Sequence, residues 1–186
     1  GGSGGGGSAN GEASGGVAIR PGGSGTANQG FTGASSVNYS NYVRAVGGGG
    51  AGSAAGQGSI PSNGGYSITS SISGKAIAYA GGGGTAGKSD NTESYRTPAG
   101  YALGGAGFAN GSNTQAFAGS ANTGSGGGGT HSTSAQRYGG NGGSGVVIFR
   151  LATSEYSGTT TGSPTVTTDG DYTVLTYTGS GTYVHS

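Results

Sequence analysis

The side chains that could carry out acid–base or metal chemistry are few and widely spaced. The histidines are His131 and His185, and neither has an aspartate or glutamate at a spacing typical of a catalytic triad or a metal-ligand set. Paired carboxylates that cleave glycosidic bonds need surroundings that separate their pKa values, and no apolar environment is evident around the acids of this chain. These acids are Glu12, Asp90, Glu93, Glu155, Asp169 and Asp171. We therefore expect no catalytic residues and predict that the chain is not an enzyme.

The tripeptide Asp169-Gly170-Asp171 could offer oxygen ligands to calcium, but the rest of a calcium-binding loop is missing. Its composition is more typical of a turn, so we expect no metal site. Glycine patterns that fit phosphate-binding loops also occur in the chain. No strand-to-helix context or Gly-Lys-Ser/Thr element follows them, so they do not predict a cofactor.

The charge and hydropathy of the chain exclude two classes of partner. Its 7 basic and 6 acidic residues give a net charge of +1, and the basic residues stand singly rather than in a stripe. A nucleic-acid partner therefore has no electrostatic basis. No segment approaches the roughly 20 apolar residues that span a bilayer, so we expect no membrane insertion.

Glycine supplies 50 of the 186 residues, so burial of apolar side chains cannot stabilise the chain in the ordinary way. Two outcomes are compatible with this composition, a flexible Gly/Ser coil or a fold held by backbone hydrogen bonds. The 11 tyrosines, the low charge and the apolar run over residues 145–151 favour the ordered state.

Glycine runs can form extended helices of three residues per turn, like polyproline II, which pair through their backbones. We call such a segment a rail. Runs at 4–7, 47–50, 81–84 and 126–129, with pairs at 104–105 and 142–143, are the predicted rails. Short apolar stretches such as residues 76–80 lead into them and predict brief strands. The fold class we expect is mostly irregular and all-β, with polyglycine II-like rails, short strands, a C-terminal β-hairpin and no significant helix.

The chain divides by composition into three parts. Residues 1–151 form a glycine-rich domain with polar and aromatic loops, and it ends on a Val-Val-Ile-Phe strand that we expect to be covered on both faces. Residues 152–168 read as a Thr/Ser/Gly linker. Residues 169–186 predict a C-terminal β-hairpin, in which a turn at Asp169-Gly170 leads into residues 172–177 and a second turn at 179–181 leads into residues 182–185.

Tyrosine and arginine beside the glycine runs are the best candidates for contact with a receptor or partner, because both residue types dominate binding hot spots. The alternative, that each tyrosine simply fills space between rails, stays open. The candidates are Tyr39, Tyr42, Arg44, Tyr95, Arg96, Tyr101, Arg137 and Tyr138.

Residues 139–150 read Gly-Gly-Asn-Gly-Gly-Ser-Gly-Val-Val-Ile-Phe-Arg. This segment closely resembles the closing segment of the glycine-rich domain of bacteriophage tail-fibre and virion proteins. Residues 161–167 and 172–182 also look like a segment that recurs beside that domain. The alternation of glycine runs and polar loops is similar to the adhesins at the tips of T-even-type long tail fibres, whose loops contact the host.

The resemblance implies a non-enzymatic virion appendage domain, in a tail fibre or head fibre, on the exterior of the particle. It presents loops to a host cell-surface receptor or to other virion proteins. The alternative is a structural assembly protein, a capsid decoration or a self-associating filament subunit, and in either case we expect a homo-oligomer.

One departure from the family concerns strand order. The family commonly places an apolar strand before its rails, whereas this chain opens on glycine and carries the strand at its end. That strand either folds back on its own chain or completes a neighbour by strand donation. The candidate assembly residues on it are Tyr172, Val174, Leu175 and Tyr177.

Overall fold

The structure is a computed structural model. It describes residues 3, 5–6, 18–38, 46–56, 63–88, 94–96, 104–105, 108–109, 115–131 and 138–185. The strands are β1 (Ala18–Arg20), β2 (Ser36–Asn38), β3 (Ile68–Ser70), β4 (Ile77–Tyr79), β5 (Ala86–Lys88), β6 (Ser94–Arg96), β7 (Phe108–Ala109), β8 (Thr130–His131), β9 (Val147–Ala152), β10 (Thr160–Thr161), β11 (Thr165–Asp169), β12 (Tyr172–Tyr177) and β13 (Thr182–Tyr183). A 3-10 turn, η1 (Thr153–Glu155), follows β9.

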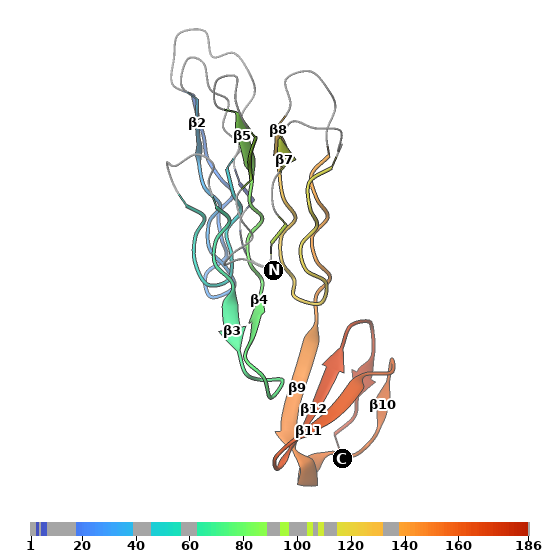
Figure 1. Ribbon diagram of the computed structural model, residues 1–186. Helices are drawn as coiled ribbons and strands as arrows, with labels where there is room; N and C mark the ends of the chain where they lie inside the picture. Colours follow the sequence, from blue (N-terminus) through green and yellow to red (C-terminus); the bar gives the residue numbers. More distant parts are fainter. Residues whose placement is uncertain are drawn as a thin grey trace.

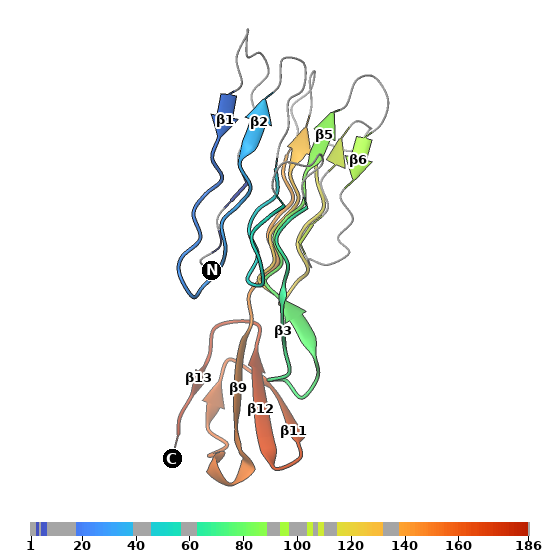
Figure 2. The same cartoon turned by 90° about the vertical axis from the view of Figure 1, so that its left-hand side faces the viewer.

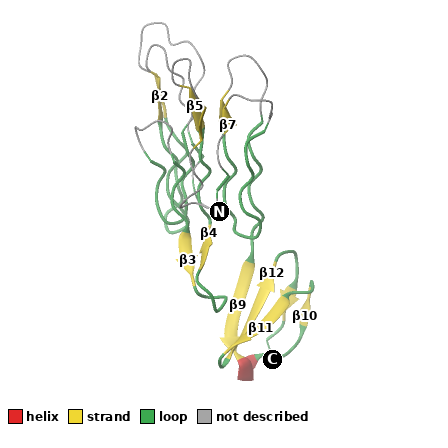
Figure 3. Ribbon diagram, in the orientation of Figure 1, coloured by secondary structure: helices red, strands yellow, loops and turns green. Residues whose placement is uncertain are grey.

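The molecule is elongated, with glycine-rich segments running along its length (Figures 1 and 2). The short strands β1, β2 and β5–β8 lie toward one end, and the sheet of β9, β11 and β12 lies at the other. Most of the described residues between these ends belong to no strand or helix (Figure 3). The expected fold class is confirmed, since the described residues form short strands within irregular structure and their helical content is η1 alone.

The glycine-rich segments are rails joined by backbone hydrogen bonds that repeat every third residue. Gly126 donates to Gly81 O at 2.9 Å, and Gly129 donates to Gly84 O at 2.8 Å. Residues 140 and 143 likewise donate to residues 128 and 125 of an antiparallel neighbour. A three-residue period is the repeat of the polyproline II conformation, in which no hydrogen bond forms within a chain. The rails are therefore polyglycine II-like.

A rail can form backbone hydrogen bonds with two neighbouring rails, donating to one and accepting from the other. Gly48 donates to Gly83 O at 3.1 Å, Gly65 donates to Gly48 O at 2.8 Å, and Gly82 donates to Gly65 O at 2.9 Å. These bonds close a triangle between three rails. Unlike a sheet, which bonds only within its plane, this arrangement satisfies backbone groups on several sides and produces a bundle.

The rails approach so closely that a side chain would not fit between them. A Cβ built on Gly82 would collide with the carbonyl oxygen of Gly48, and one built on Gly105 would collide with that of Phe117. The space is filled by backbone, which the glycine Cα–H groups contact directly. Glycine is required here for close approach, because its φ at these two rail positions is not in the left-handed region.

Side-chain burial between the rails is small. The buried apolar cluster consists of Ala34, Val46 and Ala55. Ser125 is also buried; its Oγ accepts from Gly81 N at 3.3 Å and lies 2.7 Å from Thr123 Oγ1. Small side chains thus occupy the few interior positions that are not glycine, which is what the narrow spacing between rails allows.

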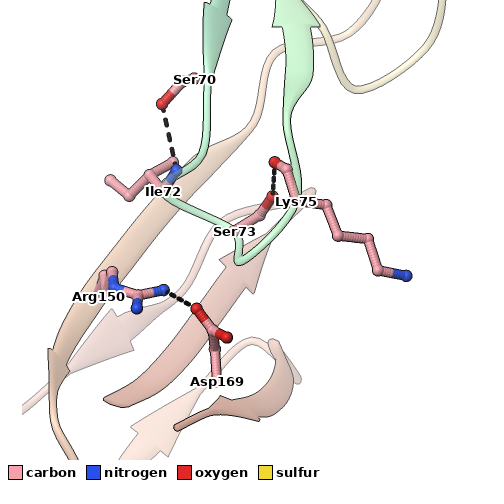
Figure 4. Close-up of polar contacts among 6 residues, drawn as sticks. All are labelled: Ser70, Ile72, Ser73, Lys75, Arg150 and Asp169. Carbon is pink, nitrogen blue, oxygen red and sulfur yellow. Dashed lines mark hydrogen bonds and ion pairs between the residues drawn. The ribbon is translucent and has the colours of Figure 1, made fainter. Parts of the chain in front are cut away.

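The β3–β4 hairpin extends from the rails toward the C-terminal sheet (Figures 1 and 4). Its turn is closed by a bond from Gly74 N to Ser71 O of 2.9 Å. Gly74 has a φ of +83° and lies against the Asp169 side chain, where a Cβ would be 3.0 Å from Cγ. Asp169 is in turn paired with Arg150, with 2.5 Å between Oδ2 and Nη1. The hairpin tip therefore contacts the sheet at an ion pair.

The C-terminal sheet has the strand order β11-β12-β9, and both pairings are antiparallel. The turn expected at Asp169-Gly170 is confirmed, because β11 and β12 are joined through Gly170 and Asp171. Gly170 has a φ of +58°, the conformation that a two-residue hairpin loop requires at its first position.

The hairpin and linker of the C-terminal part differ from expectation. The strand at residues 172–177 pairs with β11 and β9, while β13 pairs with β10. Residues 152–168, expected to form a linker, contain η1, β10 and most of β11. Threonine explains the difference. Its β-branched side chain favours strands, although a Thr/Ser/Gly composition by itself indicates a linker.

The strand β9 forms as expected, but its faces are not both covered. Val147 and Phe149 are 55% and 45% exposed, whereas Ile148 between them is half-buried. Within the described part of the chain, the three-stranded sheet packs against the short β10–β13 ribbon and the β3–β4 tip, and these cannot enclose every residue of a continuous apolar run.

A matched pair of glycines in one rail tests whether backbone contact holds the fold. A Cβ on Gly143 would collide with the Ser120 carbonyl, whereas a Cβ on Gly142 would make an ordinary contact with Ser125 O at 3.5 Å. We expect Gly143→Ala to lower the free energy of unfolding by roughly 1–3 kcal/mol. Gly142→Ala should change it by less than about 1 kcal/mol, in the stabilising direction. Denaturant titration followed by circular dichroism measures both, and equal effects would contradict the packing described.

Candidate functional site

The first candidate region is the end of the molecule at which β1, β2 and β5–β8 lie, opposite the C-terminal sheet (Figure 1). We call it the strand-bearing end. There β1 pairs with β2, β5 with β6, and β7 with β8. Contacts of β5 with β7 and β8, and of β6 with β7, bring these four strands together. The rails therefore deliver strands from distant parts of the sequence to one place (Figure 2).

Two of the predicted contact residues lie on β6. Tyr95 is opposite Gly87, and Arg96 is opposite Ala86 on β5. Five others, Tyr39, Tyr42, Arg44, Tyr101 and Arg137, lie outside the described residues. Tyr39 directly follows Asn38, the last residue of β2. The structure thus places part of the predicted set by strand register at one end of the molecule.

Tyr138 is the predicted contact residue whose side chain is described. It is 56% exposed, while its carbonyl oxygen accepts from Ala116 N at 3.0 Å. The neighbouring Gly139 carbonyl accepts from Gln115 Nε2 at 3.4 Å. The backbone is held by an adjacent rail and the ring faces solvent, so Tyr138 is a surface residue rather than filler between rails.

Exposed aromatic residues on the rails were missed by sequence reasoning. Phe31 is 48% exposed and Phe117 is 49% exposed. Phe117 stands beside Ala116, which is buried, and two residues before Gly119, which meets neighbouring backbone. Ala116 and Gly119 are three residues apart, on the inner face of the rail. The three-residue period of small residues is the signal that would have assigned Phe117 to the outer face.

The second candidate region is β12, the predicted assembly strand. Both of its edges are paired within the chain, so it is not available for donation to a neighbour in this conformation. Val174, Leu175 and Tyr177 are buried, whereas Tyr172 is exposed and lies under the Arg150 guanidinium, 4.3 Å from ring centroid to Cζ. Three of the four predicted residues therefore form the core of the C-terminal sheet. They are buried because β12 is the central strand of that sheet.

Aromatic rings cover one face of this sheet. Phe149 packs edge-on against Tyr177 with 6.0 Å between centroids, and Tyr183 stacks on Tyr156 at 6.1 Å. The Tyr183 hydroxyl donates to Glu155 O at 3.0 Å. The hydroxyl groups of Tyr177 and Tyr183 donate hydrogen bonds within the protein, which indicates that these two rings stabilise the sheet and its β10–β13 ribbon.

The Asp169 side chain and the Asp171 backbone both contribute to the C-terminal sheet. The Asp169 carboxylate pairs with Arg150, and the Asp171 carbonyl accepts from Thr153 N at 2.9 Å. Across the described ranges, no cluster of three or more His, Cys, Asp or Glu side chains could hold a metal ion. The same part of the chain contains no helix long and apolar enough to cross a membrane.

Tyr177 links the core to the C-terminal end of the chain. Its hydroxyl donates to Thr182 O at 2.7 Å. Desolvation, with a smaller contribution from Tyr156, raises the pKa of Tyr177 above its ordinary value of 10.0. The folded state therefore favours the neutral phenol more than the unfolded state does. This contribution to stability is complete below about pH 10 and is lost as the pH rises through the folded-state pKa.

We expect the denaturation midpoint of the C-terminal sheet to fall between pH 9 and pH 12, and to fall less in Tyr177→Phe, which has no hydroxyl to ionise. Near-ultraviolet circular dichroism in a urea titration at each pH measures this. An equal fall in the two proteins would show that Tyr177 is not the titrating group.

The comparison with known protein families identifies a family for most of the chain. The family model described as a glycine-rich domain matches residues 1–152, from the first rail to the end of β9. No curated protein and no solved structure matches the chain. The family match covers 152 of the 186 residues, and we conclude that the chain belongs to the glycine-rich domain family.

Proposed function

We propose that this chain is a non-enzymatic domain of a bacteriophage virion appendage, a tail fibre or a head fibre, on the exterior of the particle. In this proposal it presents its strand-bearing end to a receptor on the host cell surface. Membership of the glycine-rich domain family and the resemblance of residues 139–150 to the closing segment of tail-fibre domains support it.

The observation that carries the proposal is the gathering of β1, β2 and β5–β8 at one end of long rails, opposite the C-terminal sheet (Figure 1). A rail bonded to several neighbours resists bending because motion in any direction breaks hydrogen bonds. A stiff bundle of this kind holds the chain segments at its end at fixed positions. Such rigidity increases the affinity for a receptor, because less conformational freedom is lost when the receptor binds.

The composition of the predicted contact set suits recognition through aromatic and hydrogen-bonding groups. Tyrosine contributes large contact area with little conformational entropy, and neighbouring glycine, serine and asparagine adapt to the partner. Tyr138 illustrates the first role, since its backbone is fixed and its ring exposed. With a net charge of +1, the chain has little long-range steering, so short-range contacts would determine specificity.

A structural role in assembly is the second candidate function. It is favoured by the exposed apolar side chains of the C-terminal part, Val147, Phe149, Val166 and Val184. In this version the chain contacts other virion proteins or copies of itself, as a capsid decoration or a filament subunit. Surface apolar residues gathered in one region are typical of such contacts.

Substitution of two exposed tyrosines, which lie at opposite parts of the rails, distinguishes receptor binding from a role in assembly. Tyr138 and Tyr66 are each 56% exposed, but Tyr66 lies two residues before β3, away from the strand-bearing end. We expect virions carrying Tyr95→Ala, Arg96→Ala and Tyr138→Ala together to assemble normally. Their adsorption rate constant should fall about fivefold or more, as expected for loss of a binding hot spot.

The control is Tyr66→Ala, which should leave both adsorption and particle yield unchanged. Normal adsorption of the triple variant would reject host binding through this end. Failure of the triple variant to be incorporated into particles, with the purified chain still folded, would favour the assembly function instead.

A further inference from the structure

The outer edge of β11 is an unprotected strand edge. β11 is an edge strand of the C-terminal sheet (Figure 2). Its first four residues, 165–168, alternate between the two faces of the sheet and are all exposed. Among the described residues, its backbone has hydrogen-bonding partners only in β12. Natural proteins normally protect such edges with charged residues, proline or bulges. Residues 165–168 contain none of these, and the Asp169 charge at the end is paired with Arg150.

The hydrogen-bonding register of the C-terminal sheet determines which residues of β11 point their backbone N–H and C=O groups away from the sheet. Thr153 N donates to Asp171 O at 2.9 Å, so these two residues form a hydrogen-bonded pair of the β9–β12 register. Because antiparallel strands alternate the direction of their backbone groups, Tyr172, Val174 and Thr176 must face β11. Their partners in β11 are residues 169, 167 and 165. The outward N–H and C=O groups therefore belong to Val166 and Thr168.

From this geometry we infer that β11 pairs with β11 of a second copy of the chain, antiparallel and about a two-fold axis at Thr167. In this register Val166 lies opposite Thr168 of the partner subunit, and the same pair recurs on the other side of the axis. All the outward groups are used in four hydrogen bonds, and the two three-stranded sheets become one of six strands. The contact is isologous and closed, so it produces a dimer rather than a fibre.

A second copy suits this edge better than an unrelated strand. The edge is uncharged and β-branched, and its own sequence supplies an uncharged, β-branched partner of the same length. In the two-fold register the Asp169 residues of the two subunits lie at opposite ends of the pairing, about 14 Å apart along the strands. Repulsion between them is therefore weak. A partner strand with charges at its centre would have to place them beside valine and threonine.

Cross-linking tests the register. At the two-fold axis Thr167 faces Thr167 of the partner subunit in a non-hydrogen-bonded pair, where Cα atoms are about 4.5 Å apart and a disulfide can form. The chain has no cysteine, so Thr167→Cys introduces a single thiol. Mild oxidation with diamide should convert this variant to a covalent dimer. Thr165→Cys, whose two thiols lie about 14 Å apart along the strands in the dimer, should cross-link at least tenfold more slowly.

Sedimentation of the full chain tests the contact without oxidation. We expect a monomer–dimer equilibrium, and Thr168→Lys should raise its dissociation constant at least tenfold by placing a charge on the edge. Thr178→Lys, the same change at an exposed site outside β11, should leave it unchanged. Monomer at every concentration, or equal cross-linking of the two cysteine variants, would overturn the inference. Neither result depends on receptor binding, so the adsorption experiment remains a separate test.

Discussion

The close approach of bare backbones is the constraint on which the rest of this structure depends. Rails can donate hydrogen bonds in several directions only when their axes are too close for a Cβ, as the collision expected at Gly82 shows. Glycine, which ordinarily destabilises a folded chain through its backbone entropy, here makes possible the interactions that offset that cost. The low content of apolar side chains follows, because little space between rails is left for them.

The same constraint determines which positions of a rail must hold a small residue and which can hold any side chain. A residue at an inner position of a rail must be glycine, or alanine or serine where the spacing widens, as at Ala34 and Ser125. Outer positions accept any side chain, including Phe117 and Tyr138, without disturbing the bundle. Sequence variation at the strand-bearing end and on the outer faces is therefore compatible with one fold.

The rails were predictable from the positions of the glycine runs, because a run such as residues 81–84 has few ordered alternatives to a rail. The turn at Asp169-Gly170 and the strand β9 were equally clear from local residue types. The partner of β12 was not, since residues 165–168 have a linker-like composition and sheet order depends on distant contacts. For the end of the molecule that we propose binds a receptor, the sequence identified residue types, but the strand pairing and contacts that place Tyr95 and Arg96 beside β5 and β7 are a tertiary property.

Amide hydrogen exchange tests the three-residue period of the rails most directly. Among the hydrogen bonds between described residues, those that residues 139–143 donate to another rail come from Gly140 and Gly143, at 2.8 and 2.7 Å. The account predicts that these two amides are protected from exchange in the native protein, while those of Gly139, Asn141 and Gly142 exchange rapidly. Uniform protection or uniform rapid exchange across the five residues would contradict the claim that polyglycine II-like rails form the core.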